Sequence, residues 1–398
     1  MIQIIIFTAL LLISALSLLI TLFYFILFII NIITKRQTNK TILHLKKAIL
    51  ITAGFIVIMF GFTAFSHLLI KTPPILDSHG KVLQSSIAEL KKIKLNGRDE
   101  WISIRGKDKN KPVLLFLAGG PGGSEMAAVR YNLSALEDNF VVVNWEQPGS
   151  CKSFGAINTK DLTKYIYIED GYALTDYLCK TFGKDKIYLV GESWGSALGI
   201  FLVKEHPEKY YLFIGTGQMV AFRKNDEMNY EKAMEIAQAN NDTKLINKLK
   251  ANGRPPYYGD DLTWKFSTCN NCLNEYMAHN PEIQNFKYDT IKTIGSPEYD
   301  IPDKINYFMA LFKTFNNFYP QLYNIDLRKD YAKIDVPVYF FMGRYDVNAQ
   351  PSLAEDYYKC LKAPEKKLIW FEHSGHSPWI NESDKFIHEL LKVTVQKS

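Results

Sequence analysis

The fold is decided by one stretch of the sequence, IYLVGESWG at residues 187–195. Its first four residues form an unbroken apolar run, which is typical of a strand buried on both faces of a sheet. The next five fit Gly-x-Ser-x-Gly, and a helical pattern follows from Ala197 to Lys204. We therefore expect a sharp strand-to-helix turn that exposes Ser193 at the end of its strand. Gly191 and Gly195 allow a close backbone approach that a Cβ atom would block.

Buried strands and helices alternate on both sides of this stretch. A hairpin with an Asn-Gly turn at residues 96–97 comes first. Apolar runs predict strands at residues 113–117, 140–145, 210–214, 336–342 and 367–371, and helical spacing predicts helices at 161–182, 352–361 and 385–393. This alternation predicts an α/β fold in which helices cover both faces of a mostly parallel sheet.

The alternation is interrupted between residues 216 and 333, where the chain is helical, polar and aromatic. Helical pieces are predicted at residues 229–239, 244–249 and 307–318. An insertion of this kind, placed between sheet strands, is expected to cover the strand ends as a cap. The predicted organisation is therefore a first part of the core at 87–215, a helical cap at 216–333 and a second part of the core at 334–398.

The first 72 residues predict a membrane anchor with two transmembrane helices, at about 5–33 and 48–70, followed by a tether at 73–86. Each apolar stretch is long enough to cross a hydrocarbon core of about 30 Å. A buried core helix is one alternative for each, although a core helix of that length usually has a polar face. A cleavable signal peptide is the alternative for the first, but no basic residue precedes Lys35.

The linker between the two apolar stretches is basic and contains no acid. Basic loops stay in the cytoplasm, so the rest of the chain is expected on the extracytoplasmic side of the cell membrane as part of a two-span protein. Most of the net charge of +6 lies in this linker, which favours membrane orientation over nucleic-acid binding. The basic residues of the linker are Lys35, Arg36, Lys40, Lys46 and Lys47.

Candidate partners for Ser193 follow in the order acid, then histidine. Asp346 ends a turn after the strand at 336–342, and His376 lies in a loop after the strand at 367–371. A serine hydroxyl needs a base, so His376 is expected to take its proton and Asp346 to fix the imidazole tautomer. His373 competes with His376, which is favoured because Ser374-Gly375 gives the loop room to turn.

The glycine-rich segment AGGPGG at residues 118–123 follows a predicted buried strand. Backbone N–H groups of Gly120 and Trp194 are the expected oxyanion-hole donors. The segment lacks the Lys-Ser/Thr that a phosphate-binding loop requires. Neither a metal cluster nor a nucleotide motif is evident, so no cofactor and no metal are expected.

Five cysteines are present, and Cys269-Asn-Asn-Cys272 forms their one close pair. An odd count does not indicate a disulfide framework, and one pair is only half of a zinc site. Outside the cell the pair could form a local disulfide, and the sequence leaves this question open.

Together these segments resemble the proline iminopeptidase branch of the α/β-hydrolases. That family carries His-Gly-Gly-Pro-Gly, Trp-Asp-Gln-Arg-Gly and Gly-Gly-Ser-Trp-Gly motifs, which match residues 118–122, 145–149 and 191–195, and residues 374–378 are also similar. The departures are Ala118 in place of histidine, Pro148 in place of arginine, and the two extra apolar stretches.

The resemblance implies an α/β-hydrolase fold and an enzyme that removes an N-terminal residue, often proline. It also implies acids in the cap that bind the free amine of the substrate. Glu227, Glu231 and Glu235 are candidates for this role, although a row of charges is more often a solvated helix face.

We therefore expect a membrane-anchored serine hydrolase that forms an acyl-enzyme and acts as an aminopeptidase on small peptides. The first alternative is an esterase or lipase acting on acyl esters near the membrane. The second is a non-catalytic receptor or scaffold, which the retained serine, acid, histidine and glycine loop disfavour. The esterase alternative rests on the aromatic residues of the cap, Phe308, Phe312, Phe315, Phe318 and Tyr319.

Overall fold

The structure, a computed structural model, describes residues 2–285 and 290–395. It divides into two compact units. The first comprises Met1–Lys71 and Ile294–Ile305, and the second comprises Thr72–Thr293 and Asn306–Ser398.

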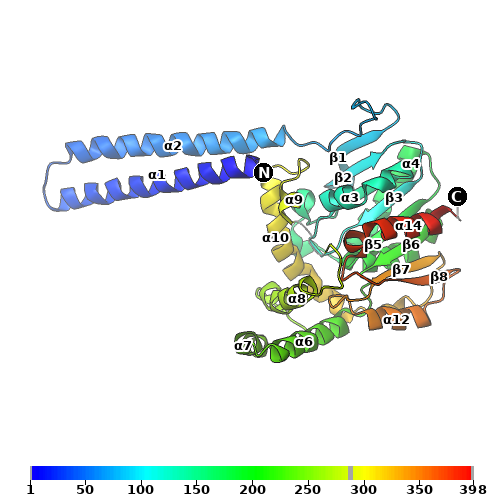
Figure 1. The fold of residues 1–398 in the computed structure, drawn as a ribbon. Helices are drawn as coiled ribbons and strands as arrows, with labels where there is room; N and C mark the ends of the chain where they lie inside the picture. The colour runs from blue at the N-terminus through cyan, green and yellow to red at the C-terminus, as the bar shows by residue number, and fades with distance from the viewer. Residues whose placement is uncertain (1, 286–289, 396–398) are drawn as a thin grey trace. The chain divides into compact units, whose positions relative to one another are not determined.

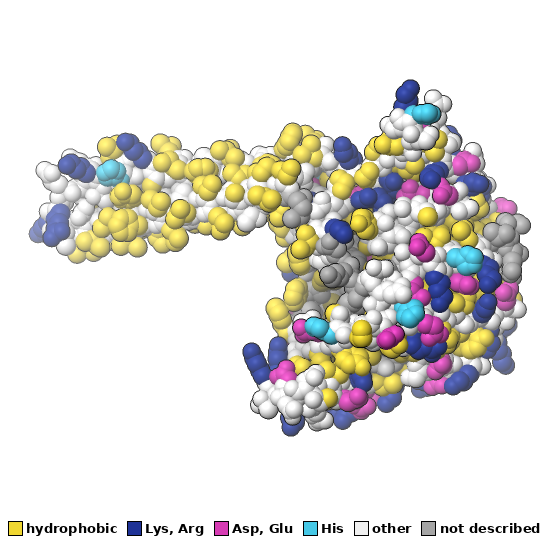
Figure 2. Space-filling view, viewed as in Figure 1, with side chains coloured by type: hydrophobic (Ala, Val, Ile, Leu, Met, Phe, Trp, Pro, Cys, Tyr) yellow, Lys and Arg dark blue, Asp and Glu magenta, His cyan; other side chains and the backbone are white. Residues whose placement is uncertain are grey.

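The first unit is dominated by two long helices, α1 (Ile2–Ile33) and α2 (Asn39–His67), which form the antiparallel hairpin in Figure 1. A hydrogen bond of 3.0 Å joins the hydroxyls of Thr21 and Thr52, and Asn31 Nδ2 donates to Thr41 Oγ1 at 2.8 Å. Both helices are long and apolar enough to cross a membrane. Apolar side chains cover them, and Lys and Arg gather at the closed end of the hairpin (Figure 2).

The two apolar stretches are thus helical, as the sequence predicts. Helix α2 begins nine residues before the predicted span, because the basic segment is helical too. Lysine and leucine favour helices, so this extension follows from local propensity. Within the same unit His67 Nδ1 lies 2.9 Å from Asp300 Oδ2.

The second unit is built on one sheet, in which the described residues form eight strands in the order β1-β2-β4-β3-β5-β6-β7-β8. The neighbouring pairs β1–β2 and β2–β4 are antiparallel, and all other neighbouring pairs are parallel. This arrangement confirms the predicted mostly parallel sheet. The strands are β1 (Ile87–Leu95), β2 (Arg98–Gly106), β3 (Val113–Leu117), β4 (Val141–Glu146), β5 (Ile187–Glu192), β6 (Tyr210–Thr216), β7 (Val338–Gly343) and β8 (Lys366–Phe371).

Helices cover both faces of the sheet. As a result, every residue of the central strands β3, β4, β5 and β7 is buried. On one face α3 (Met126–Asn132), α13 (Pro378–Asn381) and α14 (Ser383–Val395) pack around Leu114 and Phe116. On the other face α4 (Lys164–Phe182), α5 (Trp194–Glu205) and α12 (Pro351–Cys360) pack around Leu115 and Leu189.

The chain between β6 and β7 forms helices, and we call this segment the helical insertion. Its helices are α6 (Phe222–Ala239), α7 (Thr243–Asn252), α8 (Leu262–Ala278), α9 (Thr290–Ile294), α10 (Ile301–Phe318) and α11 (Leu327–Asp330). The predicted pieces fall within α6, α7 and α10. Helix α8 was not predicted as a separate element, because its threonines, asparagines and cysteines are weak helix formers. The domain boundaries given above stay predictions.

Cys269 and Cys272 lie one turn apart in α8, and both carry free thiols. Both side chains pack in a small apolar cluster with Tyr230 and Ala233 of α6. In this structure the pair therefore contributes to helix packing. Burial raises the pKa of the Cys269 thiol to about 12, so the thiol stays protonated at neutral pH.

Candidate active site

Ser193 lies at the sharp turn between β5 and α5, with φ +52° and ψ −119°. Its N–H donates to the carbonyl of Thr216 at 3.0 Å, which fixes the turn against β6. A Cβ atom at Gly191 would lie 2.2 Å from the Gly195 carbonyl oxygen, and one at Gly195 would lie 2.3 Å from that of Leu117. The turn thus depends on both glycines and holds Ser193 in a backbone conformation that non-glycine residues rarely adopt.

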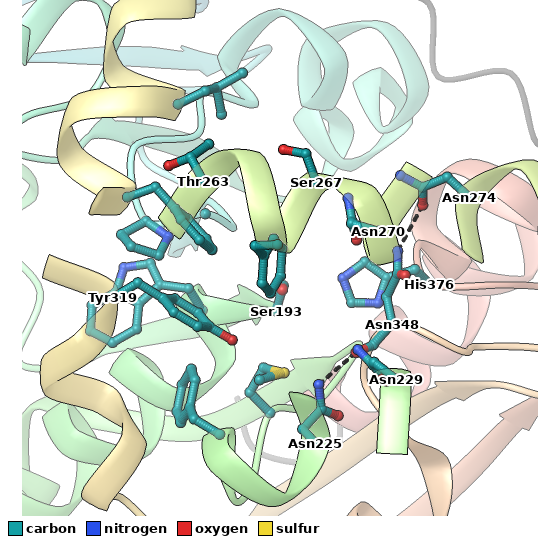
Figure 3. Close-up of a pocket in the computed structure, with 18 of the residues that line it drawn as sticks. Ser193, Asn225, Asn229, Thr263, Ser267, Asn270, Asn274, Tyr319, Asn348 and His376 are labelled. Atoms are coloured by element: carbon teal, nitrogen blue, oxygen red, sulfur yellow. Dashed lines mark hydrogen bonds between the residues drawn. The ribbon is translucent and has the colours of Figure 1, made fainter. Parts of the chain in front are cut away.

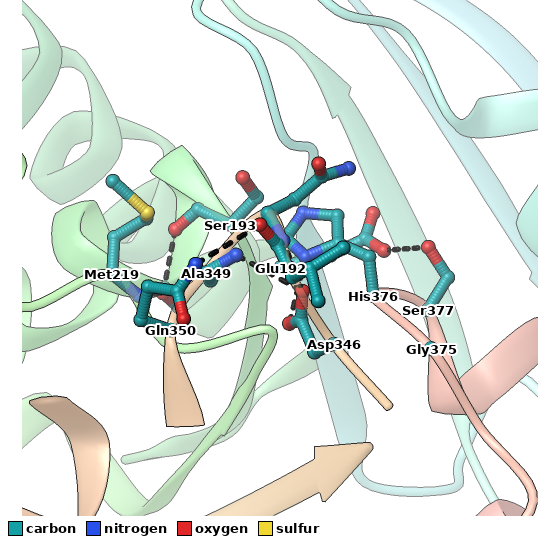
Figure 4. Close-up of polar contacts among 12 residues, drawn as sticks. Glu192, Ser193, Met219, Asp346, Ala349, Gln350, Gly375, His376 and Ser377 are labelled. Carbon is teal, nitrogen blue, oxygen red and sulfur yellow. Dashed lines mark hydrogen bonds and ion pairs between the residues drawn. The ribbon is translucent and has the colours of Figure 1, made fainter. Parts of the chain in front are cut away.

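His376 and Asp346 lie in the loops that follow β8 and β7, and Figure 4 shows them together with Ser193. The Nδ1 atom of His376 is 2.9 Å from Asp346 Oδ2. The other carboxylate oxygen accepts the N–H groups of Asn348 at 2.8 Å and Ala349 at 3.0 Å. Asp346 is fully buried and the His376 side chain is 19% exposed. The acid is therefore fixed, and the imidazole still reaches the cavity that Ser193 lines.

His373, the competing histidine, points elsewhere. Its side chain is exposed, and its Nδ1 lies 3.2 Å from the carbonyl oxygen of Glu282. It is not among the residues that line the cavity with Ser193. The geometry thus brings His376, and not His373, to Asp346.

The glycine loop at residues 118–123 borders the same cavity through Gly120 and Pro121. Gly119 uses its N–H to donate to Glu125 Oε1 at 3.0 Å. Gln147 ties this loop to the turn at Ser193, because its Nε2 donates to the Ala118 carbonyl at 3.0 Å and its Oε1 accepts Trp194 Nε1–H at 2.9 Å. Gly120 of the glycine loop and Trp194, the first residue of α5, are the predicted oxyanion donors, and both line the same cavity as Ser193.

The cavity has a volume of about 490 Å³, within the usual range for small-molecule sites. In Figure 3, Ser193 and His376 lie among side chains that the helical insertion contributes. None of the lining residues that the structure describes is Asp, Glu, Lys or Arg. The insertion and the adjacent loops contribute Met219, Phe222, Asn225, Asn229, Thr263, Phe266, Ser267, Asn270, Asn274, Leu311, Phe312, Phe315, Tyr319 and Asn348.

A family model described as the alpha/beta hydrolase fold matches residues 112–383. The chain belongs to the α/β-hydrolase family. This membership confirms the predicted fold class and the prediction that the chain is a hydrolase.

Relatives within the family include peptidases. A probable aminopeptidase of Bacillus subtilis (strain 168), YbaC, is 29% identical over 310 residues, which cover 78% of this chain and 97% of the relative. A proline iminopeptidase of Saccharolobus solfataricus is 28% identical over 302 residues, covering 74% and 87%. These similarities confirm the resemblance to the proline iminopeptidase branch of the α/β-hydrolases.

Solved structures agree on the fold. The crystal structure of a proline iminopeptidase from Mycobacterium smegmatis aligns with a TM-score of 0.55 at 14% identity, covering 78% of this chain and 98% of that one. A proline iminopeptidase-related protein from Thermus thermophilus aligns with a TM-score of 0.52 at 16% identity, covering 78% and 98%. At these identities the similarity supports the α/β-hydrolase fold alone.

Electrostatics favour the protonated form of His376 in this α/β-hydrolase. Burial by itself lowers the pKa of the imidazole, but the charge and hydrogen bond of Asp346 and the charge of Glu192 outweigh it. Together they raise the pKa of His376 to about 9. The neutral imidazole that could accept a proton from Ser193 therefore becomes the major form only above that pH.

Two acids lie close to the turn at Ser193, the buried Glu192 and the half-buried Glu125. Burial, followed by the charge of Glu192, raises the pKa of Glu125 well above its usual value, which favours the protonated form of Glu125. Glu125 Oε2 has no hydrogen-bond donor among the described residues, so a proton shared with the Glu192 carboxylate would satisfy it. Glu192 Oε1 in turn accepts the hydroxyl of Ser377 at 2.5 Å. The two acids thus connect the glycine loop, the turn at Ser193 and the loop of His376.

The structure does not bring the three predicted amine-binding glutamates to the cavity. Glu227, Glu231 and Glu235 are outside its lining and form ion pairs on α6 and its surroundings instead. Their partners are Arg223 at 3.3 Å, Arg254, and Lys232 at 2.8 Å, respectively. The placement matches the alternative of a solvated helix face, and the binding role stays an untested prediction.

Two asparagines on another face of α6 were missed by the sequence reasoning. The Nδ2 atoms of Asn225 and Asn229 donate to the Asn348 carbonyl at 2.8 and 2.9 Å. Gln350 returns two bonds, from its N–H to Asn225 Oδ1 at 2.9 Å and from its Nε2 to Asn229 Oδ1 at 2.6 Å. We call this network the amide clamp, because it ties α6 to the loop that carries Asp346. The signal in the sequence was two asparagines four residues apart, on one helix face.

A metal or cofactor site is not apparent in the part of the chain that the structure describes, where no three His, Cys, Asp or Glu side chains form a group suited to a metal ion. The arrangement of Ser193, His376 and Asp346 suits nucleophilic chemistry carried out by side chains and backbone amides.

Proposed function

We propose that this chain is a membrane-anchored serine hydrolase with Ser193 as nucleophile, His376 as general base and acid, and Asp346 as the residue that orients His376. One observation carries the proposal. Ser193 lies on a strained turn in the same cavity as a histidine that is paired with a buried aspartate. In addition, ionisable groups with perturbed pKa values tend to cluster at functional sites.

In the proposed reaction His376 takes the proton of the Ser193 hydroxyl while the oxygen attacks the carbonyl carbon of the substrate. The oxyanion that forms accepts hydrogen bonds from the N–H groups of Gly120 and Trp194. His376 then gives its proton to the leaving amine or alcohol, and an acyl-enzyme remains. Water, deprotonated by His376, attacks the ester, and Ser193 regains its proton as the acid product leaves.

We propose small peptides as the substrates, with removal of the amino-terminal residue. The named activities of the relatives, a probable aminopeptidase and several proline iminopeptidases, support this choice. The second candidate is an esterase acting on acyl esters. It is supported by the apolar side of the cavity, where Phe312, Phe315 and Tyr319 line one wall.

For the anchor, we propose that α1 and α2 cross the membrane with their connection in the cytoplasm. The basic residues at the closed end of the hairpin support this orientation. The hydrolase unit would then lie on the extracytoplasmic side. In intact cells, a protease added outside should degrade the hydrolase unit, and protection from it would reject the proposed orientation.

The test of the chemistry is labelling of the purified full chain in detergent with a fluorophosphonate probe, beside a Ser193→Ala variant. Labelling of the wild type alone is the expected result. Aminoacyl p-nitroanilides and short p-nitrophenyl esters then distinguish peptidase from esterase. A folded wild type that takes no label would reject the nucleophile and leave the non-catalytic receptor as the better hypothesis.

A further inference from the structure

Helix α8 places a row of polar side chains along the cavity that the proposed mechanism does not use. Ser267, Asn270 and Asn274 are three and four residues apart, so they share one face of the helix. Figure 3 shows them in sequence along α8, and all three line the cavity with Ser193 and His376. The other face of α8 packs against α6 through Cys269, Cys272 and Leu273, which fixes the rotation of the helix.

These side chains have unused hydrogen-bonding groups. Neither Ser267 nor Asn270 makes a side-chain hydrogen bond within the described part of the chain, and both are half-buried. Asn274 accepts from Asn348 Nδ2 at 2.8 Å, which leaves its own Nδ2 as a further donor. Polar groups at a partly buried wall gain most when a ligand supplies the missing partners, since leaving them unpaired is costly.

The chemistry of these side chains suits a ligand that has uncharged amide groups. An asparagine amide offers a donor and an acceptor side by side, which matches the C=O and N–H of a peptide bond. The side chains of this row on α8 are uncharged, so a carboxylate placed against them would find no opposite charge within the row to offset its desolvation. A peptide backbone is therefore a better partner for this wall than a terminal carboxylate.

The position of the row indicates which side of the substrate it meets. Asn274 bonds to Asn348, two residues after Asp346, so this end of α8 lies at the loop that holds His376 in place. In the proposed mechanism His376 protonates the leaving amine, so the leaving peptide extends toward that end. The aromatic side chains of Phe312, Phe315 and Tyr319 are then left to contact the substrate residue that forms the acyl-enzyme.

We propose that Asn270 and Asn274, with Ser267, bind the backbone amides of the leaving peptide, so that the preferred substrate has at least one further peptide bond after the cleaved one. This inference rests on the proposed peptidase function. It adds a specificity-determining surface on α8 and a substrate class, peptides of three or more residues.

The test compares two substrates with the same first residue, either proline or alanine. One is the aminoacyl p-nitroanilide, which has no leaving peptide, and the other is the tripeptide amide with Gly-Gly-NH₂ after that residue. The variant Asn270→Ala is matched by Asn271→Ala, since Asn271 is its exposed neighbour and lies outside the cavity lining. The full chain in detergent is used throughout, with thermal unfolding as a check on folding.

The expected result is that Asn270→Ala lowers kcat/KM for the tripeptide amide about fivefold to tenfold, the effect of one or two lost hydrogen bonds, and leaves the nitroanilide unchanged. Asn271→Ala should alter neither. Ser267→Ala is the second variant, with the same selective loss expected if Asn270→Ala does not fold. Equal losses on both substrates, or no loss on either, would overturn the α8 proposal while the peptidase function stands. A wild type that labels with fluorophosphonate but cleaves only esters would reject the peptidase function, and the α8 proposal with it.

Discussion

The two walls of the cavity differ in what holds their side chains in place. On the wall formed by the sheet, Ser193 and His376 lie in loops fixed by glycine contacts, by the buried Asp346 and by the acids Glu125 and Glu192. On the wall formed by the helical insertion, helices pack through aromatic side chains such as Phe266 and Phe315, whose ring centroids are 4.7 Å apart, and present amides with unused bonding groups. Side chains that are held rigidly are suited to making and breaking bonds. Polar side chains that lack hydrogen-bond partners are suited to binding a substrate. Changes on the first wall should stop turnover, and changes on the second should alter which substrate is used.

The largest expected effect comes from the sheet wall, in Asp346→Asn. The amide cannot hold His376 in the tautomer that accepts a proton from Ser193, so kcat should fall by about 10³–10⁴-fold. Steady-state kinetics on the best nitroanilide or ester would measure this. Asp335→Asn, which removes only a surface charge 3.4 Å from Lys333, is the control and should be near wild type. A loss below tenfold for a folded Asp346→Asn protein would show that the pair with His376 is not catalytic.

The amide clamp connects the two walls, and breaking it should have the next largest effect. In Asn225→Ala combined with Asn229→Ala, the loop of Asp346 loses all four hydrogen bonds of the clamp to α6. We expect kcat to fall by roughly tenfold or more, since a misplaced catalytic group is costly, while KM changes little. Because the defect lies in the orientation of Asp346, the pH profile should also move to lower pH, as His376 loses part of the charge interaction that raises its pKa. If KM rises and the pH profile stays unchanged, the clamp shapes the cavity only.

In the proposed mechanism, the sheet wall also sets the pH dependence of kcat/KM. His376 must be neutral to accept the Ser193 proton, and its pKa is raised to about 9, so kcat/KM should increase with pH and level off above that value. Glu192→Gln removes a negative charge that favours the protonated imidazole. The acid limb of the profile should therefore shift to lower pH, which raises activity at neutral pH. A profile of the variant that overlays the wild type would exclude Glu192 as a contributor to the pKa of His376.

How far the sequence predicted these walls follows from the range of the forces involved. The turn at Ser193 depends on steric limits within a few residues, so Gly191 and Gly195 identify it directly. The apolar runs of buried parallel strands are equally local signals, which is why the parallel strands were predicted with ends shifted by only a residue or two, whereas the two strands of the first hairpin are longer than predicted. The order Ser193, Asp346, His376 follows from the topology of the sheet, since residues beyond the ends of parallel strands meet at one edge.

The insertion wall could not be predicted in the same way, because its contacts depend on how each helix is rotated against the core. Asn225 and Glu227 are two residues apart on α6, about 200° around the helix. The sequence marks both faces as polar, and only packing decides that the asparagines meet the loop of Asp346 while the glutamates meet solvent. The resemblance implies acids as binding residues, whereas the cavity is lined by amide side chains. The same limit hid Asn270, whose neighbour Asn271 is identical in type and points away.

The smallest expected effect comes from the solvated face of α6 and sharpens the contrast between its two faces. Glu231→Gln and Glu235→Gln each remove one surface ion pair, with Arg254 and Lys232. Exposed pairs contribute about 0–1 kcal/mol, so the free energy of unfolding should change by less than about 1 kcal/mol in urea titrations. Turnover of aminoacyl p-nitroanilides should stay within about twofold, because neither side chain reaches the cavity. A selective rise in KM for substrates with a free amine would instead restore these glutamates as amine-binding residues. It would also require the insertion to close over the cavity in a different arrangement, because the present one places both side chains in solvent.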